Sequence, residues 1–166
     1  MDADECLFRT TQKSSLIERI DIMKIAFGCD PNASEMKKAL IEVVESLGHE
    51  IKDFGSDDPI YANTAIDVAN AVVSKEYDRG VVVCGTGIGV SISANKVKGA
   101  YCALITDVYQ AQRATLSNNA NMVALGAQVT GIELAKCLVK EYLSHSFDPE
   151  SRSKPKGDRI SAYEKE

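Results

Sequence analysis

Apolar residues along this chain gather in five short runs, separated by longer segments in which apolar residues recur with the period of a helix. The run at residues 80–84 is rich in β-branched valines, as a buried parallel strand is. We therefore predict strands at residues 24–29, 50–54, 80–84, 101–105 and 122–125.

Helical periodicity follows each predicted strand. After the first strand, Met36, Leu40 and Val44 share one face, and Gly48 lies where that helix should end. Further helices are predicted over residues 61–75, 90–96, 107–117 and 132–145, and a last short helix is expected over 158–166.

This alternation predicts an α/β fold: a doubly wound, Rossmann-like, five-stranded parallel sheet with helices on both faces and right-handed crossovers. A length of 166 residues fits a single domain with a sizeable core. We expect an N-terminal extension over residues 1–22, the α/β domain over residues 23–147 and a C-terminal tail over residues 148–166.

Composition narrows the classes of function. The net charge of −5 argues against a nucleic-acid partner, and no apolar run approaches the length that spans a membrane. Five cysteines without a C-x-x-C pair favour reduced thiols in a cytoplasmic protein. Residues 1–22 lack the apolar core of a secretory signal and carry too many acids for a transit peptide. The only histidines, His49 and His145, have no partner at metal-ligand spacing, so no metal site is predicted.

The stretch from residue 80 to residue 91 carries the most chemistry. It is a valine-rich strand that ends at Cys84 and is followed by Gly85, Gly87 and Gly89. Ligands bind at the carboxyl ends of strands in such sheets, where glycines let the backbone N–H groups approach an anion. A thiol at the start of the next helix is also favoured as the thiolate. The stretch thus combines an anion cradle with an activated sulfur.

Other interpretations of this stretch stay open. A cysteine at a strand end is commonly a small buried core residue. The glycines could form a dinucleotide loop with Asp107 as the ribose-binding acid, although Val90 stands where the third glycine of that motif belongs. A phosphate-binding loop of the Walker type is excluded, because no Gly-Lys-Ser/Thr follows.

More polar residues follow the other predicted strands, and they should share the same edge of the sheet. They are Asp30, Thr106, Asp107 and Gln128. A thiolate base, an amide-lined loop and a carboxylate suit the removal of a proton next to a carbonyl, with Thr86 bonded to a substrate oxygen. The basic residues of the tail fit either a phosphate or a solvated surface.

The run from Cys84 to Lys96, Cys-Gly-Thr-Gly-Ile-Gly-Val-Ser-Ile-Ser-Ala-Asn-Lys, closely resembles the signature of ribose-5-phosphate isomerase B and its relatives. Those relatives include galactose-6-phosphate isomerase subunits and tetrulose-4-phosphate isomerases. The resemblance extends over residues 24–147, including Gly28-Cys29-Asp30 and the segments 117–120 and 131–135. The tail resembles the divergent fungal and tetrulose-phosphate branch of the family.

The resemblance implies an aldose–ketose isomerase of phosphorylated sugars that uses neither metal nor cofactor. Cys84 would move the proton between C1 and C2 through a cis-enediol, and Thr86 with the loop would hold the intermediate. The loop residues are Gly85, Gly87, Ile88 and Gly89, and the residues implied to bind sugar hydroxyls are Asp30 and Asn118. It also implies an obligate homodimer with the site and the tail at its interface, and leaves pairing into a tetramer open.

The sequence departs from the family pattern around this core. Pro31 and Ser117 replace histidines, the latter used for ring opening, and Gln128 replaces an arginine. Some relatives carry histidine at Thr106. Positive charge for a phosphate is left to Arg113, Arg152 and Lys156.

These departures leave the substrate open. The expected reaction is ribose 5-phosphate to ribulose 5-phosphate, a step of the pentose phosphate pathway. The alternatives are an isomerase of a tetrulose 4-phosphate or another sugar phosphate, or a non-catalytic nucleotide-binding module or partner subunit.

Overall fold

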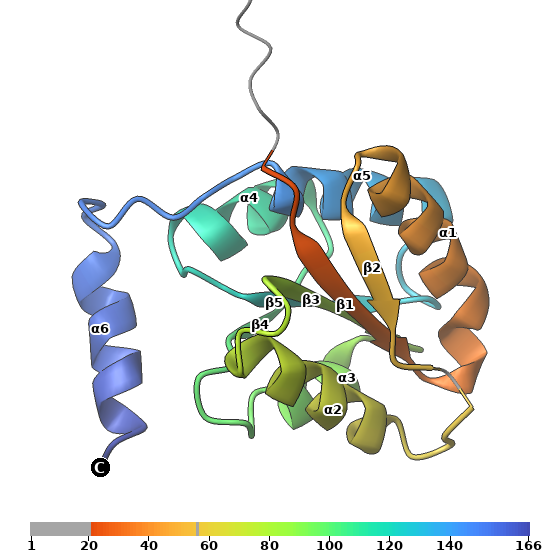
Figure 1. Cartoon of the computed structure of the whole chain (residues 1–166), viewed down its shortest axis with the longest axis horizontal. Coiled ribbons are helices and arrows are strands. Elements are labelled where there is room, and N and C mark those ends of the chain that lie inside the picture. Colours follow the sequence, from red (N-terminus) through yellow and green to blue (C-terminus); the bar gives the residue numbers. More distant parts are fainter. Residues whose placement is uncertain (1–20, 56) are drawn as a thin grey trace, which may run out of the picture.

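The computed structural model describes residues 21–55 and 57–166, so most of the expected N-terminal extension lies outside the described residues. All five predicted strands are present in one fully parallel sheet with the order β2-β1-β3-β5-β4 (Figure 1). The strands are β1 (Lys24–Cys29), β2 (Glu50–Asp53), β3 (Arg79–Cys84), β4 (Cys102–Leu104) and β5 (Met122–Gly126).

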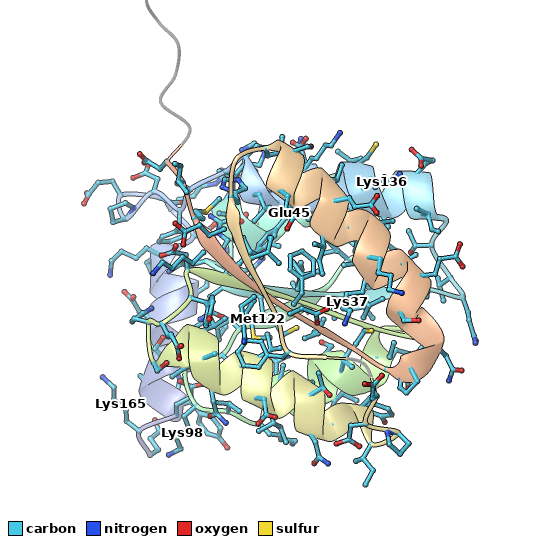
Figure 2. The ribbon with its side chains drawn as sticks, turned by 45° about the vertical axis from the view of Figure 1, so that its right-hand side comes forward. Lys37, Glu45, Lys98, Met122, Lys136 and Lys165 are labelled. Atoms are coloured by element: carbon cyan, nitrogen blue, oxygen red, sulfur yellow. The ribbon has the colours of Figure 1, made fainter. Side chains whose placement is uncertain are left out.

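Helices cover both faces of the sheet, which confirms the predicted doubly wound α/β class (Figure 1). One face carries α2 (Tyr61–Val73) and α3 (Ile88–Ala94), and Met122, labelled in Figure 2, fills the core on this side. The opposite face carries three further helices, which pack around Phe27, Leu125 and Tyr142. These helices are α1 (Ser34–Ser46), preceded by the 3-10 turn η1 (Pro31–Ala33), α4 (Val108–Leu116) and α5 (Ile132–Leu143).

The last helix differs from the prediction. It is α6 (Lys154–Tyr163), which begins before the expected residue 158. Pro155 lies in its first turn, where the missing N–H costs nothing, so the proline starts the helix instead of delaying it. None of its residues is buried, and it stands beside the three layers in Figure 1.

Few contacts hold α6 to the domain. The Glu164 carboxylate accepts the backbone N–H of Gly99 at 3.1 and 3.2 Å, and the Tyr101 hydroxyl lies 2.7 Å from that of Ser161. Both Gly99 and Tyr101 precede β4, so α6 contacts the edge of the sheet where the strands begin.

Polar side chains hold three positions around the sheet. Lys37 on α1, labelled in Figure 2, is buried and pairs with Asp53 at 2.6 Å. His49, in the loop before β2, accepts the N–H of Met23 at 3.2 Å. On the outer edge of β4, the Asn95 amide bonds both the N–H and the C=O of Cys102 at 2.8 Å.

No described helix is both long and apolar enough to cross a membrane.

Candidate active site

Cys84 is the last residue of the central strand β3, and its thiol faces the loop that leads into α3. The side chain is buried, and the N–H of Gly87 points at its sulfur from 3.1 Å. Gly87 has φ = +79°, a left-handed conformation that glycine adopts readily. This turn sends the chain back over the sulfur, so a donor faces it when it carries negative charge.

The glycine loop is pressed against the end of β5. A Cβ on Gly126 would lie 2.6 Å from backbone atoms of Thr86, and one on Gly87 would lie 2.6 Å from the Leu104 side chain. The carbonyls of Cys84 and Gly85 accept the N–H groups of the two residues that follow Gly126. The loop is therefore held in one conformation by the neighbouring strand.

Two kinds of group line the open side of the loop. The Thr86 hydroxyl is exposed and accepts the N–H of Ile88 at 3.3 Å. The N–H groups of Gly89 and Val90, in the first turn of α3, have no acceptor among residues 21–55 and 57–166. Donors and a hydroxyl thus lie beside the thiol, and they suit a developing negative charge on oxygen.

Cys102 is a second buried thiol in the same sheet. Cys102 lies in β4, and burial raises the pKa of its thiol to about 12, so it stays protonated at neutral pH. Cys84 lies at the end of its strand, next to the loop donors.

Asp30 lies on the neighbouring strand end. Its N–H donates to the carbonyl of Val83, which places it beside the end of β3. Its carboxylate also accepts the N–H of Asn32 at 2.8 Å and caps η1. The side chain is half-buried, so the cap leaves it at the rim of the thiol site.

The residues after β4 serve mainly local structure. The Asp107 carboxylate accepts the N–H of Gln110 at 2.9 Å and caps α4, which accounts for this acid without a ribose. The Thr106 N–H donates to the Gln110 side chain at 2.7 Å. Since β5 separates β4 from β3, neither residue adjoins Cys84 along the sheet.

No sequence pattern pointed to Tyr61, whereas Gln128 was expected at this edge of the sheet, where it replaces an arginine of the family. A Cβ on Gly89 would lie 2.5–2.6 Å from the ring and hydroxyl of Tyr61, so the phenol rests on the third loop glycine. A Cβ on Gly85 would lie 3.4 Å from the Gln128 amide. No local sequence signal marks Tyr61, because the contact joins the start of α2 to the start of α3.

Asn118 and Arg113 lie far from Cys84 within one chain. Asn118 is in the turn between α4 and β5, so it lies at the edge where the strands begin, whereas Cys84 lies where β3 ends. Its amide donates to the carbonyl of Arg113 at 2.9 Å, and the Arg113 guanidinium donates to the Ser117 hydroxyl at 2.7 Å. A strand of six residues, about 20 Å at 3.3 Å per residue, separates this group from the thiol.

The basic tail residues do not reach the thiol either. Arg152 and Lys156 are exposed, and neither makes an ion pair with a described residue. The helix that carries Lys156 contacts the segment before β4, so it lies toward the same edge as Asn118. Across the described part of the chain, no group of three or more His, Cys, Asp or Glu side chains is placed to hold a metal ion.

A parallel α/β sheet with a thiol and an amide-lined loop at the carboxyl end of its central strand defines a protein that binds a small ligand at that edge. The chain belongs to the ribose/galactose isomerase family, whose model matches residues 25–160. It is a sugar-phosphate isomerase of this family, as the resemblance of the thiol loop predicted.

Individual relatives cover nearly the whole chain. D-erythrulose-4-phosphate isomerase 2 of Mycolicibacterium smegmatis is 43% identical over 148 residues, which are 86% of this chain and 97% of that protein. Ribose-5-phosphate isomerase B of Escherichia coli is 36% identical over 144 residues, 85% of this chain and 96% of that protein. The solved structure of Clostridium thermocellum ribose-5-phosphate isomerase B has a TM-score of 0.82 and 38% identity, and it covers 86% of this chain and 98% of its own.

Proposed function

We propose that this protein interconverts an aldose phosphate and its ketose isomer, with Cys84 as the base that moves a proton between C1 and C2. The observation that carries the proposal is the Cys84 sulfur at the end of β3, faced by the Gly87 N–H at 3.1 Å and by the loop donors. A base next to preorganised donors is the arrangement that an enediolate intermediate requires.

The chemical step follows from these groups. The Cys84 thiolate takes the proton from C2 of the aldose, and the C2–H electron pair forms the C1=C2 bond while the negative charge moves to O1. The loop N–H groups and the Thr86 hydroxyl stabilise that charge. A proton then passes from O2 to O1, and the thiol returns its proton to C1, which yields the ketose.

Ring chemistry favours a four-carbon substrate. Ribose 5-phosphate closes a five-membered ring that must open first, whereas a four-carbon sugar carries its phosphate on the oxygen that would close such a ring. The ring-opening position of the family is Ser117 here, and its hydroxyl accepts the Arg113 guanidinium at 2.7 Å. Neither histidine is free: His49 accepts the Met23 N–H, and His145 pairs with Glu141 at 2.8 Å.

Two relatives named as erythrulose-4-phosphate isomerases support this choice, at 43% and 40% identity. We therefore place D-erythrulose 4-phosphate before ribose 5-phosphate as the substrate. Ribose 5-phosphate remains the second candidate, because relatives named for it are 42% and 36% identical.

We further propose that the active site is shared between two copies of the chain. Five large apolar side chains are exposed together over α3, β4 and the start of α4, and we call them the edge surface: Ile88, Ile92, Leu104, Val108 and Tyr109. A two-fold axis perpendicular to the strands would bury this surface against itself. The end of β3 in one copy would then face Asn118 and the basic residues of the other.

The first experiment follows proton exchange by NMR in deuterated water, at C2 of erythrose 4-phosphate and ribose 5-phosphate and at C1 of erythrulose 4-phosphate. We expect exchange with the four-carbon pair, and a loss of about a hundredfold or more in Cys84→Ala. The matched control is Cys137→Ala, which removes an exposed thiol on α5 and should keep full activity. Exchange with ribose 5-phosphate alone would reverse the order of substrates. A wild-type protein silent on all three would favour a non-catalytic subunit.

A further inference from the structure

Tyr61 is a polar residue at the site that neither the sequence motif nor the proposed chemistry uses. It is the first residue of α2 and is 38% exposed. Its ring and its hydroxyl both lie against Gly89, since a Cβ on that glycine would be 2.5 Å from Cζ and 2.6 Å from Oη. The hydroxyl therefore points over the loop rather than away from it.

The Tyr61 hydroxyl has no hydrogen-bond partner among the described residues, although it is rigidly placed. Other tyrosine hydroxyls that lie against the protein are engaged: Tyr142 donates to the carbonyl of Ala120 at 3.0 Å, and Tyr101 lies 2.7 Å from Ser161. A placed, accessible hydroxyl without a protein partner is free to bond a ligand.

The position of Tyr61 is fixed by the surrounding structure. Asp58 accepts the N–H of Ile60 at 2.7 Å and the Asn63 amide at 2.9 Å, and these bonds hold its pKa below the usual range, so the turn persists at neutral pH. The next turn of α2 packs tightly on β1, because a Cβ on Gly28 would lie 2.6 Å from Thr64. The helix start cannot swing away from the loop without breaking these contacts.

We propose that the Tyr61 hydroxyl is a further substrate-binding group, which bonds the sugar oxygen held by the free Gly89 and Val90 N–H groups. This inference rests on the proposed function. The phenol ring lies beside the loop, and its hydroxyl adds one more hydrogen-bond donor to those of the backbone. The contact is made at the reacting end of the substrate, so it strengthens as charge develops on that oxygen.

The test compares Tyr61→Phe, which keeps the ring on Gly89 and removes only the hydroxyl, with Tyr77→Phe. Tyr77 is a half-buried tyrosine before β3, at the opposite edge of the sheet, so its loss is the matched control. In Tyr61→Phe we expect kcat/KM to fall by about threefold to tenfold, the worth of one hydrogen bond. The dissociation constant of a phosphorylated hydroxamate, which mimics the enediolate, should rise by a similar factor, with an unchanged melting temperature.

The outcomes separate the two proposals. An active wild type with unchanged kcat/KM and hydroxamate affinity in Tyr61→Phe would overturn the role of Tyr61 and leave the isomerase intact. An inactive wild type that also fails to bind the hydroxamate would overturn the proposed function, and the inference with it. A lowered melting temperature with unchanged hydroxamate affinity would show that the hydroxyl serves only the fold.

Discussion

Lys37 and Asp53 form one ion pair, but the two side chains differ in their access to water. The Lys37 side chain is 2% exposed and that of Asp53 is 44% exposed. Removing the aspartate leaves a buried ammonium group without its partner, whereas removing the lysine leaves a carboxylate that water can reach. The two deletions should therefore differ in cost, although each breaks the same ion pair, and Asp53→Ala also removes the acceptor of the Gly55 N–H at 2.8 Å.

We predict that Asp53→Ala lowers the free energy of unfolding by on the order of 3 kcal/mol, and Lys37→Met by about 1 kcal/mol. Urea denaturation of both variants measures the difference. The double variant should recover most of the loss of Asp53→Ala, because no charge remains buried. Equal losses in the two single variants would contradict this account.

The residues of the site differ in how well the sequence predicted them. Cys84 and its glycines are contiguous, so their shared position at the end of β3 followed from one local pattern. Tyr61 meets Gly89 only because α2 and α3 pack side by side on the same face of the sheet. Such a contact depends on how helices are placed, which the pattern of apolar residues does not specify.

At the scale of elements, His49 joins the loop before β2 to the start of β1. Burial, and second the Arg79 charge, hold the pKa of this histidine below its ordinary value of 6.5. Its ring nitrogen accepts the Met23 N–H, which requires the unprotonated form. The unfolded chain binds the proton more readily than the folded one, so stability is lost as the pH falls below about 6.5.

We predict that the melting temperature of His49→Asn falls less than that of the wild type between about pH 7 and about pH 5. The asparagine oxygen can replace the ring nitrogen as acceptor for Met23 and does not titrate. Differential scanning calorimetry at several pH values compares the two proteins. An equal fall in the melting temperature of the two proteins across this pH range would contradict the prediction.

The elements themselves were largely predictable from the sequence. All five strands occur near their predicted positions. The central strands β3 and β5 are buried on both faces and therefore apolar, whereas the exposed strand β2 has only one apolar residue, Ile51. The last helix was placed too late, since α6 has no buried face and therefore no apolar period to mark its start. The sequence patterns located the buried elements, and they misplaced the start of α6, which has no buried residue.

At the scale of the whole molecule, Cys84 and Asn118 lie at opposite edges of the sheet. We predict that Cys84→Ala and Asn118→Ala are each nearly inactive, and that mixing the two after reversible unfolding restores activity. A mixed dimer would contain one site with both defects and one with none. Equal amounts should therefore recover about a quarter of the wild-type rate.

The control mixes Cys84→Ala with Cys137→Ala instead of Asn118→Ala. The Cys137→Ala chain carries both an intact Asn118 and an intact Cys84, so it is active without complementation. Failure of the two defective variants to complement one another, while each still forms dimers, would show that each chain builds its site alone. The residue pattern alone could not predict a shared site, which entered only as what the family resemblance implies, because such a site depends on an interface rather than on the fold of one chain.

The amide of Asn95 has a consequence for how copies can associate. An edge strand with free N–H and C=O groups is a template on which another chain can extend the sheet without limit. Asn95 already occupies both groups of Cys102, and the Ser91 hydroxyl adds a second donor to its carbonyl. The outer side of β4 therefore offers fewer free backbone groups on which another chain could add a strand, and this lowers its tendency to extend the sheet.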